Sequence, residues 1–177
     1  MGVPQIAAHF FVFYIGHLGR EDVKSITAYL RASHCHYMQQ CFPAIHEGIH
    51  TLVKELDSVS QKLIDKFYDD YDREIINHFR YEEDTVFPYI EELLAGNRPT
   101  GAQYSIRQFE QNHSNISEKL NDLKNIITKY LDESYSSPHR FELLNAIYKV
   151  ERDLQRHSLI ENRLLIPLVE KLEKSHE

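Results

Sequence analysis

The feature that most constrains this chain is a motif that occurs twice at helical spacing. His78 lies four residues before Glu82, and His157 lies four residues before Glu161. In both copies a proline follows the glutamate by six residues. Residues four apart in an α-helix project from the same face, one turn apart. Each copy therefore predicts a helix that presents an imidazole and a carboxylate together, as a metal site requires.

A chance origin of these pairs has to be weighed first. With 11 histidines in 177 residues, about one to three His-x-x-x-Glu pairs are expected by chance, and most are solvated surface contacts. His17 and Glu21 form such a pair. The other two share a longer pattern, because Glu74 and Asp153 each lie one turn before the histidine. An acid there suits a hydrogen-bond acceptor for the N–H group of a ligand imidazole.

Composition limits the classes of partner and the location of the protein. The chain has 177 residues, 42% of them hydrophobic, and a formal net charge of -7. It is long enough to bury a core as one domain, and its scattered lysines and arginines form no basic stripe, so nucleic acid is not expected as a partner. Cys35 and Cys41 lie on one predicted helix but on different faces, which argues against a disulfide. Because the sequence also shows no recognisable signal peptide, the two unpaired cysteines favour a cytoplasmic location.

The N-terminal segment differs from the rest of the chain. Residues 1–20 are mostly apolar and precede a main domain over residues 21–177. The apolar stretch is too short to span a bilayer and contains two histidines, so no membrane attachment is expected. We interpret the segment as one that covers the core or contacts a partner. The oligomeric state stays open, and a homodimer is compatible with this interpretation.

Sparse glycine and proline, six each, together with apolar residues at intervals of three and four, predict an all-α chain. Breaks fall at Asp57-Ser58, at residues 95–101 and at residues 133–138, where Pro138 suits the first position of a helix. The expected fold is an antiparallel up-down-up-down four-helix bundle with an extra N-terminal helix. The predicted helices cover about 33–56, 59–95, 102–131 and 138–174, after a shorter one near 21–31. Three prolines fall inside these helices and predict kinks: Pro43, Pro88 and Pro167.

The bundle topology brings further histidines to the level of the repeated motif. In such a bundle, two residues on successive helices are level when the turn lies midway between them in sequence. The midpoint between His78 and His113 falls on a predicted break, and so does the midpoint between His113 and His157. The same rule makes either His34 or His36 level with these three. One layer of the core is therefore expected to receive four histidines and two glutamates.

This donor set indicates a centre with two metal ions. Four imidazoles and two carboxylates exceed the needs of a tetrahedral structural zinc. Two metals can share the set if each glutamate bridges them and each metal binds two histidines. Nitrogen and oxygen ligands with open positions favour non-heme iron, although manganese or zinc would accept the same donors. The ferritin-like pattern places Glu before His, which is the reverse of the order here, and no constellation for hydrolysis or phosphate binding is present.

The residues resemble the hemerythrin-like, or HHE cation-binding, domain family, and within it the bacterial repair-of-iron-centres di-iron proteins. The resemblance covers about residues 21–174 and favours His34 over His36. It implies an oxo- or hydroxo-bridged centre of two iron ions. The ligands that it implies are His34, His78, Glu82, His113, His157 and Glu161.

The resemblance also implies roles in oxidative or nitrosative stress and in the repair of iron–sulfur clusters. The expected partners are a small diatomic or peroxide ligand and damaged iron–sulfur proteins. One departure matters, because Ser117 stands four residues after His113, where oxygen-carrying hemerythrins have a second histidine. Whether the protein is an enzyme stays open: a redox-active di-iron protein is preferred, and a carrier or sensor of O₂, NO or iron without turnover is the alternative.

Overall fold

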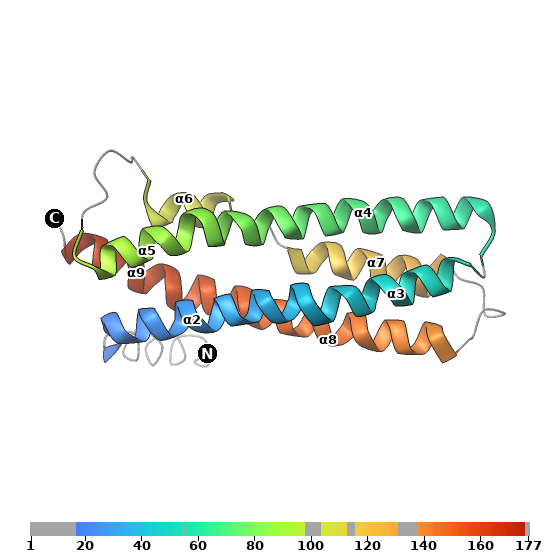
Figure 1. Ribbon diagram of the computed structural model, residues 1–177, viewed down its shortest axis with the longest axis horizontal. Helices are drawn as coiled ribbons and strands as arrows, with labels where there is room; N and C mark the ends of the chain where they lie inside the picture. The colour runs from blue at the N-terminus through green and yellow to red at the C-terminus, as the bar shows by residue number, and fades with distance from the viewer. Residues whose placement is uncertain (1–16, 55, 98–103, 113–115, 131–137, 176–177) are drawn as a thin grey trace, which may run out of the picture. The chain divides into compact units, whose positions relative to one another are not determined.

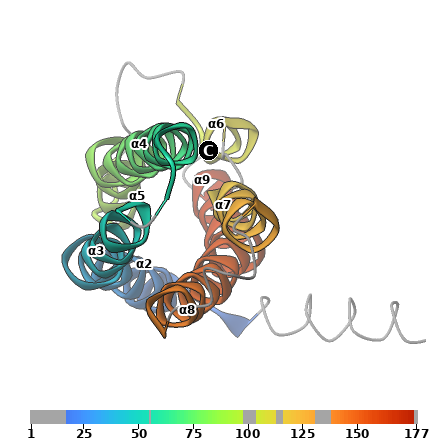
Figure 2. The same cartoon turned by 90° about the vertical axis from the view of Figure 1, so that its right-hand side faces the viewer.

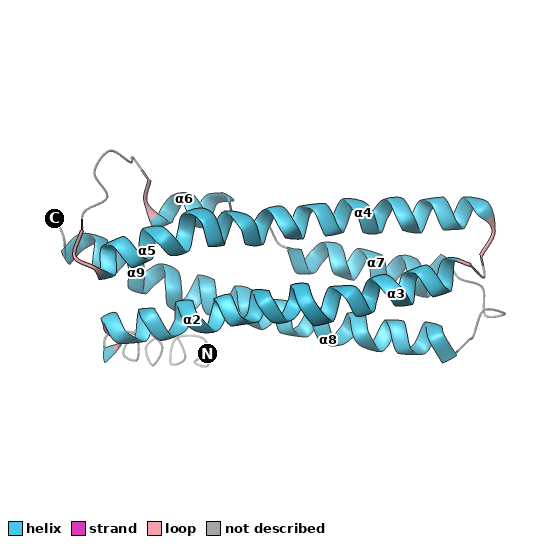
Figure 3. Cartoon of the chain, in the orientation of Figure 1, coloured by secondary structure: helices cyan, strands magenta, loops and turns pink. Residues whose placement is uncertain are grey.

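The computed structural model describes residues 17–54, 56–97, 104–112, 116–130 and 138–175. Within these ranges the secondary structure is entirely helical, with no strand (Figure 3), which confirms the all-α class. Three helices are long: α2 (Arg20–His36, 17 residues), α4 (Ser58–Tyr81, 24 residues) and α8 (Pro138–Ile160, 23 residues). No helix in the described part of the chain combines the length and the apolar character that crossing a membrane requires.

Three helical stretches join α2 to α3 (Phe42–Val53), α4 to α5 (Phe87–Leu94) and α8 to α9 (Ile166–Ser175) (Figure 1). In each of them a short π-helix interrupts the α-helical path. The first runs through α2, η1 (Tyr37–Cys41) and α3. The second runs through α4, η2 (Glu82–Val86) and α5, and the third through α8, η4 (Glu161–Leu165) and α9. In the sequence, α6 (Ile106–Asn112) and α7 (Ile116–Tyr130) lie between the second and the third of these stretches.

Proline explains where the π-helices occur. Pro43, Pro88 and Pro167 are each the second residue of the α-helix that follows a π-helix. A proline inside an α-helix has no N–H group, and its ring clashes with the carbonyl four residues earlier. A π-turn adds a residue to the turn and so changes which carbonyl faces the proline. The expected position of these prolines inside helical stretches is confirmed. The kinks stay a prediction, and the π-turns were not predicted.

Capping accounts for two of the predicted breaks. The Asp57 carboxylate accepts hydrogen bonds from the N–H groups of Val59 and Ser60, at 2.9 and 3.0 Å, at the start of α4. The Ser60 hydroxyl adds a third bond, and these bonds lower the pKa of Asp57. After α5, Gly96 has a φ of 82°, a left-handed conformation that glycine adopts without strain.

The N-terminal part of the fold departs from the sequence prediction. The extra helix expected near residues 21–31 is not a separate element, because α2 continues from Arg20 to His36 and leads directly into η1. The sequence contains no glycine or proline between Arg20 and Phe42, so nothing there ends the helix. Most of the apolar segment 1–20 lies outside the described residues.

The chain divides into two compact units, and each has its own core. The larger unit comprises Ala32–Arg80 and Ser114–Ser158. Figure 2 shows α3, α4, α7 and α8 of this unit in a view along their axes. Their apolar faces and η1 supply one cluster of buried side chains, which includes Tyr37, Phe42, Ile45, Ile49, Leu52, Ile64, Tyr71, Ile75, Phe79, Leu120, Leu123, Ile127, Ile147 and Leu154.

The second unit comprises Met1–Arg31, Tyr81–His113 and Leu159–Glu177. Its core is built from the start of α2, from η2 and α5, from α6, and from η4 and α9. Hydrogen bonds join the start of α2 to the end of α5: the Arg20 guanidinium donates to the carbonyls of Leu93 and Leu94. The buried core residues are Val23, Leu30, Val86, Phe87, Ile90, Leu93, Ile106, Phe109, Leu165, Ile166, Leu168, Val169 and Leu172.

Candidate metal site

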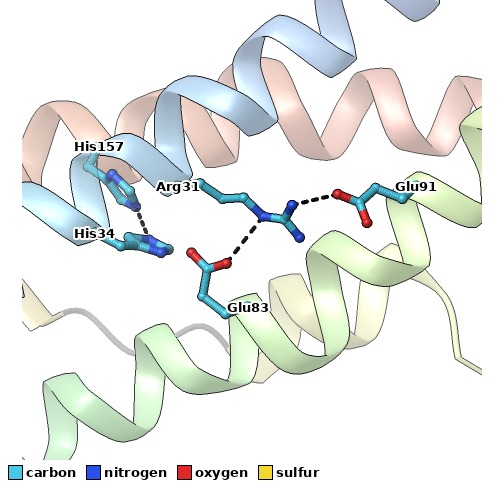
Figure 4. Close-up of polar contacts among 5 residues, drawn as sticks. All are labelled: Arg31, His34, Glu83, Glu91 and His157. Carbon is cyan, nitrogen blue, oxygen red and sulfur yellow. Dashed lines mark hydrogen bonds and ion pairs between the residues drawn. The ribbon is translucent and has the colours of Figure 1, made fainter.

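Two of the expected ligand histidines meet in the larger unit. The Nε2 atoms of His34 and His157 lie 3.2 Å apart, and both side chains are buried (Figure 4). His36 is exposed, and its Nε2 lies 3.3 Å from the Cys41 Sγ. The structure therefore places His34, and not His36, beside His157.

Aromatic rings hold the two imidazoles in place. His34 stacks on Phe79 with ring centroids 4.2 Å apart and an interplanar angle of 23°. Tyr37 meets His157 edge-on at 5.8 Å and stacks on Phe79 at 5.9 Å. Such ring contacts fix side-chain orientation, and the apolar wall that they form keeps bulk water away from the nitrogen atoms.

His78 lies in the last turn of α4 and is also buried. Its ring centroid is 5.7 Å from that of Phe79, the same ring that supports His34. His113, the remaining expected histidine, lies outside the described residues. The larger unit thus brings the rings of His34, His78 and His157 to one phenylalanine.

The two expected carboxylates belong to the second unit. Glu82 and Glu161 are both completely buried, with 0% of each side chain exposed. Their carboxylate oxygens lie within 4.8 Å of one another. Burying a carboxylate is costly unless a partner compensates its charge, and two carboxylates this close repel each other. A bound cation would relieve this repulsion.

Helix continuity relates each glutamate to its histidine. Glu82 is the first residue of η2, directly after α4, and Tyr81 between the two elements keeps α-helical angles. Glu161 opens η4 after α8 in the same way. Both glutamates therefore begin a π-turn, a feature often found at functional sites. Each unit thus contributes a buried pair of donors that suits a metal ion: the imidazoles of His34 and His157 in one, and the carboxylates of Glu82 and Glu161 in the other.

An arginine clamp in the second unit holds the π-turn that contains Glu82. The Arg31 guanidinium lies 3.2 Å from a carboxylate oxygen of Glu83 and 2.6 Å from one of Glu91 (Figure 4). It also lies over the Phe87 ring, 5.3 Å from the centroid. One side chain of α2 is thus tied to η2 and α5. Sequence reasoning missed this clamp, because its residues are far apart in the chain.

The acids that precede each ligand histidine have other contacts. Glu74 forms an ion pair with Lys119, and Asp153 lies 3.6 Å from Arg156. Their expected role as acceptors for ligand imidazoles remains a prediction. Sequence reasoning also missed the ion pair between Lys124 and Glu151, which joins α7 to α8 at 2.6 Å with side chains only 12% and 11% exposed.

Comparison with known proteins supplies the family. A family model described as the hemerythrin HHE cation binding domain matches residues 26–169, which is most of the chain. Neither the search of curated proteins nor the search of solved structures gives a match.

Proposed function

This chain belongs to the hemerythrin HHE cation-binding domain family, and on that premise we propose that it holds a centre of two metal ions, with iron as the favoured metal. The proposed ligands are His34, His78, Glu82, His113, His157 and Glu161. The arrangement that would bring these residues together is an antiparallel four-helix bundle, in which the pair α6 and α7 forms the third helix.

The burial of Glu82 and Glu161 carries this proposal. Both carboxylates are fully buried and lie within 4.8 Å of each other, an arrangement whose mutual repulsion divalent cations would remove. The short distance suits carboxylates that bridge two ions. Because the donors are nitrogen and oxygen atoms without a thiolate, they suit non-heme iron, and manganese or zinc would also accept them.

The residues of this chain would prepare the site in three ways. The imidazole nitrogens of His34 and His157 already face each other at 3.2 Å, so little rearrangement is needed to bind a metal. Phe79 and Tyr37 hold the rings and exclude water. The Arg31 clamp fixes the turn that begins with Glu82. When bound, iron would supply a redox couple and an open position for a small oxidant.

We infer a role in the response to oxidative or nitrosative stress, in which the centre reacts with O₂, NO or peroxide or gives up iron for the repair of iron–sulfur clusters. The alternative is a carrier or sensor whose bound ligand or iron changes a contact with a partner. Hydrogen peroxide mixed with the reduced, iron-loaded protein in the presence of excess electron donor, which can re-reduce the centre after each reaction, separates these roles. Repeated turnover supports the redox role, whereas one equivalent consumed per centre supports the carrier or sensor.

An anaerobic titration with ferrous iron, followed by elemental analysis of the desalted protein, tests the centre itself. We expect about two irons per chain, and fewer for the variant His34→Ala. The matched control is His36→Ala, which alters an exposed histidine two residues away and should retain full occupancy. A single iron per chain in the wild type, or equal loss in both variants, would contradict the proposed centre.

A further inference from the structure

Three tyrosines form a connected chain in the second unit. Tyr81, the residue before Glu82, directs its hydroxyl toward the Tyr104 hydroxyl at 3.4 Å. The Tyr104 ring meets the Tyr89 ring edge-on, with centroids 4.9 Å apart. The three rings therefore lead step by step from the turn that carries Glu82 to Tyr89.

The far end of this chain has a carboxylate in place to receive a proton. The Tyr89 hydroxyl donates a hydrogen bond to Oε1 of Glu173 at 2.6 Å, which is short for a hydroxyl donor and typical of a charged acceptor. The backbone N–H of Ile106 donates to the same oxygen at 2.8 Å. Two donors thus fix the carboxylate against the phenol.

The phenols of Tyr89 and Tyr104 have raised pKa values, and burial is the largest cause for each. Burial raises the pKa of Tyr89, and the hydrogen bond to Glu173 raises it further. Burial likewise raises the pKa of Tyr104, with a contribution from Tyr81. A protonated phenol loses an electron readily only if its proton leaves at the same time, because the radical cation that would otherwise form is a strong acid. Glu173 supplies the base that Tyr89 needs for this step.

We propose that Tyr89 and Glu173 form a proton-coupled redox pair, and that Tyr104 and Tyr81 carry an electron from it toward the turn of Glu82. In the net step the O–H bond of Tyr89 breaks. The electron passes across the rings of Tyr104 and Tyr81, whose O–H bonds stay intact, to a one-electron oxidant that iron in the proposed centre together with peroxide would supply. The proton moves to Oε1 of Glu173. The products are a neutral tyrosyl radical, a neutral carboxylic acid and an oxidant reduced by one electron.

The redox pair rests only on the contact between Tyr89 and Glu173, whereas the electron path rests on the proposed metal centre. Its consequence would be protective, because an oxidising equivalent held at Tyr89 is removed from the ligand side chains.

The pair is tested in metal-free protein with a photogenerated one-electron oxidant, such as a ruthenium polypyridyl complex with persulfate. Transient absorption and electron paramagnetic resonance then report the tyrosyl radical. We expect Tyr89→Phe to remove the long-lived radical, and Glu173→Gln to slow its formation and shorten its lifetime. The control Tyr148→Phe alters an exposed tyrosine of α8 and should leave the signal unchanged. A long-lived radical that survives in a folded Tyr89→Phe variant overturns the pair.

The path is tested in iron-loaded protein mixed with peroxide. We expect the Tyr89 radical in the wild type and at least tenfold slower formation in Tyr104→Phe, which loses the hydroxyl contact to Tyr81 but keeps the contact between Tyr89 and Glu173. If the radical forms by photo-oxidation but not with iron and peroxide, the path is wrong and the pair stands. If iron does not bind at all, the proposed function fails together with the path, and the metal-free experiment still decides on the pair.

Discussion

Replacing Glu161 with glutamine should stabilise the metal-free protein, although it removes a proposed metal ligand. The carboxylates of Glu161 and Glu82 are fully buried and lie within 4.8 Å of each other. Two unit charges at that distance repel by about 3.5 kcal/mol for an effective dielectric constant of 20. Glutamine has nearly the same shape without the charge, so most of this repulsion disappears in the variant.

The expected effect is large enough to measure by thermal unfolding. For a protein of this size, about 1 kcal/mol shifts the unfolding midpoint by roughly 2–4 °C, so the midpoint of metal-free Glu161→Gln should rise by about 10 °C. With iron the sign reverses. The neutral amide bridges metals poorly, and the increase in midpoint that iron causes should shrink in the variant.

Circular dichroism of metal-free and iron-loaded protein measures all four midpoints. The matched control is Glu142→Gln, an exposed glutamate of α8, the helix that leads into η4, and it should change stability by less than about 0.5 kcal/mol. A metal-free Glu161→Gln variant that is no more stable than the wild type would refute the reasoning. It would show that contacts of the carboxylate outweigh the repulsion.

Three further predictions concern other parts of the chain. Lys124→Met leaves the nearly buried Glu151 without its ion-pair partner and should lower the free energy of unfolding by about 3–5 kcal/mol. Adding Glu151→Leu should restore most of that loss. Urea unfolding in a double-mutant cycle measures both effects. Gly48→Ala gains about 1 kcal/mol of helix propensity, but its new Cβ would lie 2.9 Å from Cδ1 of Leu143. A small rotamer shift of Leu143 would cost a similar amount, so we expect the stability to change by less than about 0.5 kcal/mol. Because Ser117 stands where oxygen-carrying hemerythrins have a second histidine, the reduced iron-loaded protein should oxidise in air without a lasting oxygen adduct, and a long-lived reversible absorption band in stopped-flow mixing with O₂ would contradict this.

Much of the helical framework could be predicted from the residues that begin and end helices and from the spacing of apolar residues. The stretches expected at 59–95 and 138–174 correspond to Ser58–Leu94 and Pro138–Ser175 in the structure. Their limits were readable because Asp57 and Pro138 have well-defined capping roles. The continuity of α2 with η1 was missed because we divided a stretch that contains no residue able to end a helix.

The candidate site was predictable to the extent that its chemistry is local. The spacing of His157 and Glu161 required only helical geometry, and both side chains are buried as a metal site would need. The resemblance favoured His34 over His36, but spacing alone left both open, because it does not show which face of α2 lies beside His157. The Arg31 clamp joins residues 60 positions apart, and no local pattern indicates such a contact.

The π-turn at η4 has a consequence for the helix that follows it. An α-helix turns by about 100° per residue, so an inserted residue rotates everything downstream about the axis. Deleting one residue from η4 would restore an α-helical turn, and Leu168, Val169 and Leu172 would rotate away from the core that they now fill. The extra residue therefore changes the rotation of α9 about the helix axis relative to α8. It allows one continuous helix to present a polar cluster at Glu161 and an apolar stripe in α9 on the faces where each is needed.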